Sequence, residues 1–420
     1  GRRALPPRLS SMALPKWLPF VRRPPPAPPA EARTVHIYWF TAACFLLLLL
    51  RLWLWHTAGQ RAKRKALLEA ERAISARRSA ARHHDGDLPP RSSDIYERVQ
   101  DCLRLWREAK YLEGYEELQW LRKHLPIVDE SIRWPSREQL AARRLKHLTD
   151  AGGEMFLLEK RGRICEEALD TLIGSSEGWD VTVSDEGTKV SSRVRPMPGP
   201  NNMIDTKVEA VLDGIQCEHT LMVFREGDLY PSWFPFVSHG SIVYGASATE
   251  VIAHLLFEVN LYGCMDLCLQ GFGCDNLRDG NFLLCVRHCS QQDVLPLTGR
   301  EIELPPKPNA TGKLFKLGRI KAIIDIMVEP LSPTSVRFSY SCSQPAPKIA
   351  PAWIISWVLK SGMGSIFGRM KAVCRAMASG DPASRKRYPI VDRLSTPEYK
   401  YVVDDLSGRV EGYLRRMGWA

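Results

Sequence analysis

The sequence predicts an α+β fold in which a curved antiparallel sheet holds one long C-terminal helix. Apolar residues between Pro351 and Met377 recur with the 3.6-residue period of an α-helix. Just before this segment, residues 323–328 form a β-branched apolar run and residues 336–342 alternate between apolar and polar, which is typical of two strands joined by a turn. Interior glycines weaken an isolated helix by about 1 kcal/mol each, so contacts with the sheet must stabilise this one.

The rest of the sheet is expected between Gly178 and Cys289. Extended patterns there predict six further strands, at residues 179–183, 188–195, 203–212, 251–259, 265–272 and 281–289. A short helix at 217–225 and a proline-broken aromatic segment at 229–236 separate the first three from the last three. With the two final strands, we expect about eight or nine strands in one domain that covers residues 154–380.

Residues 35–58 are predicted to cross a membrane. A spanning helix needs roughly 20 apolar residues, and this segment is long enough, with Arg51 as its one certain charge. Aromatic residues lie towards both of its ends, where membrane-interface belts lie. A cleaved signal peptide is the alternative, but no small-residue cleavage site follows a short apolar core.

The flanks of this segment predict its orientation. Arg61, Lys63, Arg64 and Lys65 follow it, and the excess of positive charge places the C-terminal bulk of the chain in the cytosol. We therefore expect a single-pass protein of the endoplasmic reticulum or another endomembrane, while an Arg-rich, acid-poor start leaves an organelle transit peptide open. Eleven cysteines, an odd number without a dense framework, are typical of reduced thiols.

The remaining segments have simpler compositions. Residues 1–34 are proline-rich and expected to be disordered, 59–91 form a basic helical linker, 92–153 a helical bundle and 381–420 a C-terminal tail. The net charge is +11, but the basic excess gathers before Glu69 and flanks the apolar segment. This distribution argues against a nucleic-acid-binding surface.

Several short stretches match a known domain family, at residues 208–213, 228–235, 329–331 and 349–353. With the order of helices and strands, they make Glu154 to Met377 resemble the START domain, the lipid-transfer domain related to steroidogenic acute regulatory protein. Asp266 falls where that family has an Arg-Asp pair, although Met265 stands in place of the arginine. The family's proline–tryptophan–proline cluster is replaced by residues 260–262. The resemblance implies a helix-grip fold with an apolar cavity that holds one lipid.

A cavity between the sheet and the last helix would be mostly apolar, with a few polar groups that orient the ligand. The candidate ligand-binding residues are Trp233, Asp266, Phe272, Arg287, Tyr340, Ile355, Leu359 and Ile366. Arg287 lies where the family's strand usually carries an arginine, and facing inward it would bind a phosphate or carboxylate, or pair with Asp266. The alternative is an arginine that faces solvent, because strand parity is not fixed by the sequence.

Catalytic and metal-binding motifs are missing from the sequence. The chain has no nucleophile elbow, no P-loop and no dinucleotide-binding glycine fingerprint. Cys264 and Cys268, and likewise Cys285 and Cys289, are four residues apart, but zinc clusters use tight turns rather than mid-strand pairs. We therefore expect no metal, no cofactor and small buried thiols.

These observations predict a membrane-tethered protein, not an enzyme, that binds or transfers one lipid. Its partners would be a membrane and a sterol, phospholipid or sphingolipid, with no nucleic acid. Two alternatives stay open. One is a membrane adaptor whose cavity is filled by side chains. The other is an enzyme that uses the same pocket, with an acid or base drawn from Asp266, His239 or Glu329.

Overall fold

A computed structural model describes most of the chain after residue 94. The described residues are 95–125, 136–150, 153–175, 177–183, 188–198, 201–247, 249–259, 263–298, 301–306, 318–347 and 352–419. All of them belong to one compact unit of the chain. The predicted disordered segment, the predicted membrane segment at 35–58 and the basic linker lie outside the described residues.

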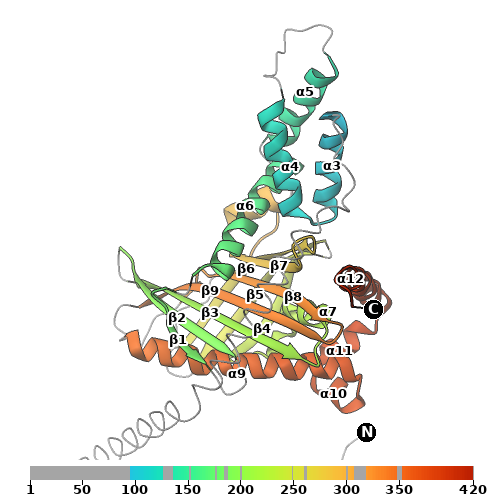
Figure 1. Ribbon diagram of the computed structural model, residues 1–420. Helices are drawn as coiled ribbons and strands as arrows, with labels where there is room; N and C mark the ends of the chain where they lie inside the picture. The colour runs from blue at the N-terminus through green and yellow to red at the C-terminus, as the bar shows by residue number, and fades with distance from the viewer. Residues whose placement is uncertain are drawn as a thin grey trace, which may run out of the picture. The chain divides into compact units, whose positions relative to one another are not determined.

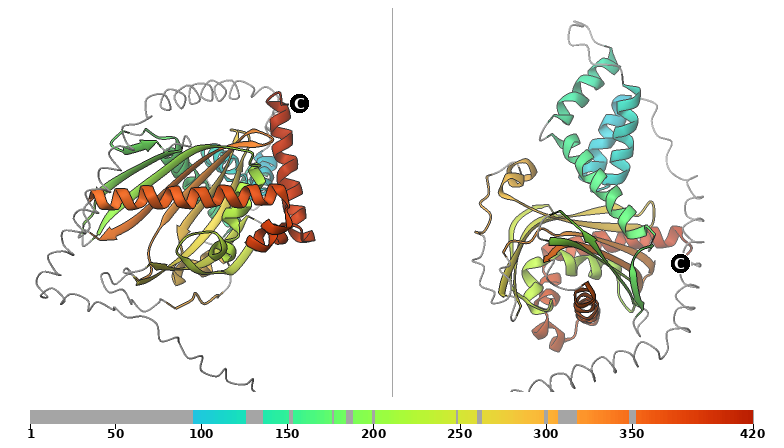
Figure 2. Two further views of the ribbon diagram at one scale, coloured as in Figure 1. Left: turned by 90° about the horizontal axis from the view of Figure 1, so that it is seen from below. Right: turned by 90° about the vertical axis from the view of Figure 1, so that its left-hand side faces the viewer.

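The centre of the structure is one antiparallel sheet, which curves around a long helix (Figures 1 and 2). The described residues place nine strands in it, in the order β1-β2-β3-β9-β8-β7-β6-β5-β4. Their bounds are β1 Asp180–Val183, β2 Lys189–Pro196, β3 Asn201–Asp213, β4 Val237–Ser247, β5 Glu250–Val259, β6 Gly263–Asn276, β7 Asn281–His288, β8 Ile323–Ser332 and β9 Ser335–Pro347. The chain thus places its last two strands at the middle of the sheet, beside β3 and β7.

The structure confirms all eight predicted strands and adds β4, which the sequence analysis missed. Glycine and serine interrupt β4, so no two-residue period shows in it. Its pairing with β5 also contains three register shifts, near His239, Tyr244 and Ser247. Each shift reverses the alternation of the side chains, which explains why the pattern could not reveal this strand.

Helix α9, Ala352–Ser379, confirms the predicted long helix and crosses the sheet on one side (Figure 2). We call the sheet face towards α9 the inner face and the opposite one the outer face. Helix α7, Cys217–Arg225, and the 3₁₀ turn η2, Gly227–Ser232, also pack on the inner side. None of the helices in the described part of the chain, α9 included, is both long and apolar enough to cross a bilayer.

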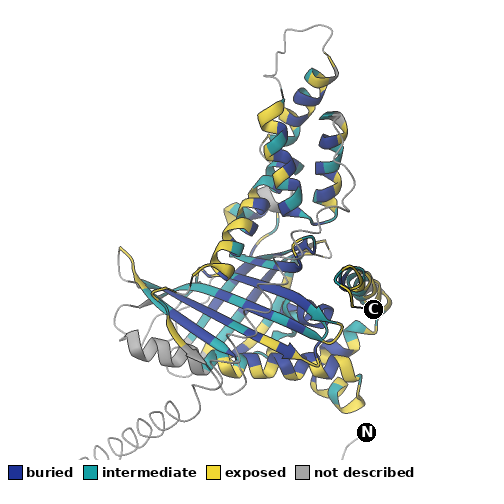
Figure 3. Cartoon of the chain, in the orientation of Figure 1, coloured by how far each residue is buried: buried dark blue, intermediate teal, exposed yellow. Residues whose placement is uncertain are grey.

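A group of helices, which we call the helical layer, contacts the outer face and projects away from the sheet (Figure 1). It consists of α3 Ile95–Arg107, α4 Tyr111–His124, α5 Arg137–Thr149 and α6 Glu154–Ile173, all of which the sequence predicted as helices. The contact with the sheet is made mainly by α4 and α6. Their apolar side chains form one core with outer-face residues of the sheet, including Phe272, Leu283 and Met327. Because α6 shares this core with the preceding helices, it belongs structurally to the bundle as well as to the sheet domain. Both faces of the sheet thus carry buried residues, and Figure 3 colours the strands mostly as buried or intermediate.

The C-terminal residues are not a tail. They form α10 Pro382–Arg387, α11 Pro389–Leu394 and α12 Pro397–Arg416. Ile390, Val391, Val410 and Leu414 are buried in the inner-face core, because both α11 and α12 present an apolar side to it. A second short helix, α8 Gln291–Thr298, was also not predicted.

A glycine fixes the contact between α4 and α6. A Cβ atom added to Gly162 would lie 2.3 Å from Cβ of Tyr115, whereas one added to Gly368 on α9 would meet no atom within 4 Å. We expect Gly162→Ala to lower the free energy of unfolding by about 1–3 kcal/mol through overpacking. Gly368→Ala should instead raise it by about 0.5–1 kcal/mol, since alanine favours the helix. Urea denaturation of both variants tests this, and equal effects would contradict the close approach.

Candidate functional site

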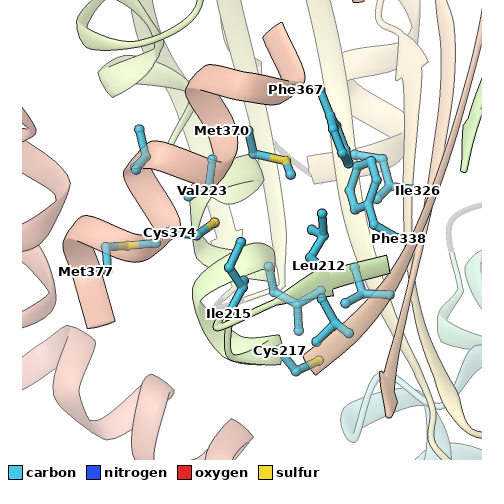
Figure 4. Close-up of a cluster of buried hydrophobic side chains, with 14 of the residues drawn as sticks. Leu212, Ile215, Cys217, Val223, Ile326, Phe338, Phe367, Met370, Cys374 and Met377 are labelled. Atoms are coloured by element: carbon cyan, nitrogen blue, oxygen red, sulfur yellow. The ribbon is translucent and has the colours of Figure 1, made fainter. Parts of the chain in front are cut away.

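Half of the inner face is a packed core. Side chains from the sheet, α7 and α9 point towards one another there (Figure 4). The residues labelled in the figure are Leu212, Ile215, Cys217, Val223, Ile326, Phe338, Phe367, Met370, Cys374 and Met377. All of them are buried, so this part of the interior has no room for a ligand.

Burial decreases along the inner face away from this core. Residues paired across β7, β8, β9 and β3 form three successive rows. The first row is fully buried and consists of Phe282, Val328, Phe338 and Ala210. In the second row two of the four residues are half-buried, and the row consists of Leu284, Ile326, Tyr340 and Val208. In the third row three are half-buried, and the row consists of Val286, Ile324, Cys342 and Thr206.

Tyr340 and Cys342 are the polar residues among the half-buried members of these rows. Burial raises the pKa of Tyr340 well above its usual value and that of Cys342 to about 11. Both side chains nevertheless keep accessible surface. Side chains in this region are therefore packed less closely than those of the neighbouring core. We call this region the inner chamber and define it by Leu284, Val286, Ile324, Tyr340 and Cys342 of the sheet with Met363 and Ile366 of α9.

Three of the predicted ligand-binding residues lie on the inner side. Tyr340 and Ile366 border the inner chamber, and Trp233 is buried in the adjoining core, where its ring packs against those of Phe224, Tyr230 and Phe234. The indole N–H of Trp233 has no hydrogen-bond partner among the described residues. Ile355 and Leu359 belong to α9, but their side chains lie outside the described residues.

The other three predicted residues lie on the outer face, which corrects the sequence-based site. Phe272 packs against the ring of Tyr111 from α4, with ring centroids 5.7 Å apart. Arg287 donates a hydrogen bond to Asp325 at 2.6 Å, so the predicted pair with Asp266 does not form. The helical layer buries outer-face residues too, and therefore apolar alternation along β6 and β7 could not tell the two faces apart.

Asp266 holds Arg319, which lies in the segment before β8, against the outer face of the sheet. Its Oδ2 atom accepts hydrogen bonds from Nε and Nη2 of Arg319, at 3.0 and 2.6 Å. The same oxygen lies 2.9 Å from Nε2 of His254. Arg319 also donates to the carbonyl oxygen of Pro305 at 2.7 Å. Asp266 is fully buried in this cluster, and its Oδ1 atom has no hydrogen-bond partner among the described residues.

The acid–base candidates of the enzyme alternative do not meet in the inner chamber. Asp266 lies on the outer face, as does Glu329, which pairs with Arg337 at 3.7 Å. His239 on β4 is exposed. Among the described residues, no group of three or more histidines, cysteines or acidic residues has the arrangement of a metal site.

Ion pairs connect the C-terminal helices α11 and α12 to other elements on the inner side of the sheet, and the sequence analysis missed them. Arg393 of α11 donates to Oδ1 and Oδ2 of Asp228 at 2.8 and 2.6 Å, and to Glu226 at 2.5 Å. Arg409 of α12 donates to Asp275 at 3.0 Å. No local pattern reveals these pairs, because their partners are more than a hundred residues apart in the sequence.

Buried thiols and phenols predict a loss of stability at alkaline pH. Burial raises the pKa of Cys342 to about 11 and that of Cys374 to about 12. In the unfolded chain a thiol titrates near 8.5, so above about pH 8.5 the unfolded state binds fewer protons than the folded state. The stability contributed below that pH is therefore lost as the pH rises towards the folded-state pKa values. We expect Tm to fall steadily between pH 8 and pH 10, and to fall less in Cys374→Val; equal slopes would refute this contribution.

Comparisons with known proteins give modest likenesses. No protein-family model matches the chain, and a search of curated proteins found no match. Among solved structures, human StAR-related lipid transfer protein 5 is 16% identical, with a TM-score of 0.42 over 54% of this chain and 99% of that one. Human STARD10 is 12% identical, with a TM-score of 0.39 over 65% of this chain and 94% of that one. The Zhui aromatase/cyclase from Streptomyces is 8% identical, with a TM-score of 0.29 over 42% and 96%.

These TM-scores are all below 0.5, so we assign the fold from the chain's own strands and helices. One antiparallel sheet wraps a long C-terminal helix, with the last two strands in its middle. The described chain therefore has the helix-grip architecture that its resemblance to START domains predicts.

Proposed function

We propose that this chain binds one lipid in the inner chamber and carries it between membranes. The observation that supports this most directly is the decrease in burial along the inner face, from a packed core to enclosed side chains that keep accessible surface. Apolar side chains border nearly all of that space. Each CH₂ group of a lipid that leaves water for such a space contributes about 0.8 kcal/mol of binding free energy.

The proposed activity needs no catalytic residue. Among the described chamber residues, only Tyr340 and Cys342 carry a polar hydrogen in their side chains. The raised pKa of Cys342 keeps it a thiol at neutral pH, and a thiol is a poor nucleophile compared with a thiolate. A sterol, a phospholipid or a sphingolipid would each supply enough apolar surface to bind. Because binding needs no catalytic residue, we propose a lipid carrier and not an enzyme.

We also propose that residues 35–58 anchor the chain in a membrane. The support comes from the sequence, which is apolar over this length and followed by basic residues. The positive flank favours a cytosolic position for the lipid-binding domain, on the endoplasmic reticulum or another endomembrane. All ten cysteines of the described residues are free thiols, which agrees with a reducing compartment.

Native mass spectrometry of residues 61–420, followed by lipid extraction, tests the proposed lipid binding. We expect one lipid per chain, either co-purified or taken up from liposomes of mixed composition. A chain that stays free of lipid after incubation with those liposomes would exclude the proposal.

The second candidate is a membrane adaptor without a ligand. The packed half of the inner face favours it, since side chains already fill that part of the interior (Figure 4). If they fill the rest as well, no lipid will be taken up. The same mass measurement therefore separates the two functions.

A further inference from the structure

We infer that the part of the ligand held inside the inner chamber is uncharged and carries a hydroxyl or carbonyl group. A sterol or a diacylglycerol fits this description, whereas a lipid whose phosphate must enter the chamber does not. The inference rests on the proposed lipid binding and names the class of lipid. It follows from where the structure places the charged side chains.

The arginines that would bind a phosphate lie on the other face of the sheet and are already paired. Arg287 is hydrogen-bonded to Asp325 at 2.6 Å, and Arg319 to Asp266 at 2.6 Å. Val286 and Arg287 are neighbours on β7, and Ile324 and Asp325 are neighbours on β8. Successive side chains of a strand point to opposite faces of the sheet. The same alternation that puts the apolar residues into the chamber therefore removes the charges from it.

Charged groups on the inner side lie near the packed core and are engaged there. Arg393 is held by Glu226 and Asp228, and Arg409 by Asp275. Lys371 of α9 is buried, lies 5.3 Å from the ring centroid of Phe367, and takes part in a further interaction.

The one buried histidine of α7 adds no charge. Burial lowers the pKa of His219, so this side chain is neutral at pH 7. None of the twelve inner-face residues in the three rows across β7, β8, β9 and β3 carries a charge. A phosphate without a cationic partner in such a space would lose its hydration at a cost of several kcal/mol.

A neutral polar group does find a partner in the inner chamber. Tyr340 and Cys342 are two residues apart on β9, so their side chains lie on the same face of the sheet. Tyr340 stays protonated because burial raises its pKa, so its hydroxyl can donate to a carbonyl or accept from a hydroxyl. One such bond orients an otherwise apolar ligand without requiring a charge.

The test offers the full-length chain four lipids in equal amounts. The chain is purified in dodecyl maltoside, mixed with cholesterol, dioleoylglycerol, dioleoylphosphatidylcholine and dioleoylphosphatidylserine, and examined by native mass spectrometry. Ile324→Trp is designed to fill the inner chamber. The amount of lipid bound in the chamber is therefore the amount retained by the wild-type chain minus the amount retained by this variant. Cys342→Phe serves as a second filling variant in case the first does not fold.

We expect the neutral lipids to exceed the two phospholipids in the inner chamber by about tenfold or more, which corresponds to about 1.4 kcal/mol. Equal or greater retention of either phospholipid would overturn the inference and leave the proposed lipid binding intact. If the filling variants and the wild-type chain retain the same lipids, the proposed function fails and the inference fails with it.

Tyr340→Phe tests the polar contact separately. It keeps the ring and removes only the hydroxyl, so affinity for the retained neutral lipid should fall by roughly 2- to 10-fold, the effect of one hydrogen bond. Tyr401→Phe is the matched control, because Tyr401 is 76% exposed on α12 and should leave affinity unchanged. Equal affinities in the two variants would show that Tyr340 does not orient the ligand.

Discussion

Replacement of Arg161 by methionine is expected to lower the free energy of unfolding by about 3–5 kcal/mol. Arg161 of α6 is only 5% exposed and donates a hydrogen bond to Glu250 of β5 at 2.6 Å. It also donates to the hydroxyl of Tyr111 at 3.0 Å. The methionine would leave Glu250, itself 7% exposed, as a buried carboxylate without its cation. This pair connects the helical layer to the sheet, so its loss should also loosen that contact.

Further contacts of Arg161 add to the expected loss. The guanidinium lies 4.4 Å from the ring centroid of Trp106 and 5.5 Å from that of Phe272. Gln270 donates to the other oxygen of Glu250 at 2.6 Å, so that carboxylate keeps one partner in the variant. Urea denaturation of the full-length chain, followed by tryptophan fluorescence, measures the change.

Two control variants separate the buried pair from other effects. Arg163→Met changes an arginine one residue beyond Gly162 on the same helix, where the side chain is largely exposed and pairs with Glu159. It should cost far less stability than Arg161→Met, because water screens this exposed pair. The double variant Arg161→Met with Glu250→Gln should recover part of the loss, because no uncompensated charge remains. A loss below about 1 kcal/mol in Arg161→Met would contradict the structural role of the pair.

Ile324→Trp should abolish lipid uptake while the protein stays folded. Ile324 is half-buried on β8 and borders the inner chamber. If the space beside it is open, an indole can enter it without displacing packed side chains, and it would occupy the volume that a lipid needs. We expect at least a tenfold lower occupancy, about 1.4 kcal/mol or more, when lipid uptake from liposomes is measured by native mass spectrometry.

The neighbouring position on the same face provides the control. Ile326 is two residues further along β8 and lies in the packed core, 2% exposed. Ile326→Trp should cost about 1–3 kcal/mol or more by overpacking, since no open space adjoins it. A similar loss of stability in Ile324→Trp would mean that the inner chamber is filled, which favours the adaptor function.

Much of the secondary structure could be predicted because its signals are local. Strand β9 alternates over Val336, Phe338 and Tyr340, and α9 repeats its apolar residues every three to four positions. Where the local signal fails, the prediction failed too. The register shifts in β4 erase its period, and α12 was taken for part of a tail because its apolar side matters only against α7 and the sheet.

The functional site could be predicted only in part. Tyr340 and Ile366 lie on the inner side of the sheet, where their role as ligand-binding residues stays a prediction, while Asp266, Phe272 and Arg287 lie on the outer face. A strand turns successive side chains to opposite faces, and a one-residue difference in register exchanges the two. The helical layer buries the second face as well, so apolarity does not distinguish the faces here.

The sequence by itself determined eight of the nine strands, the long helix α9 and their order, because hydrophobic period and turn residues act between neighbours along the chain. It also led to the proposal of a lipid ligand, through an apolar sheet and helix. Only the tertiary structure decided which side chains face each other. It placed the charges of Arg287 and Arg319 in outer-face pairs, while the described inner-face rows across β7, β8, β9 and β3 contain no charged residue. The physical reason is that register, helix docking and contacts between distant segments depend on the whole packed chain.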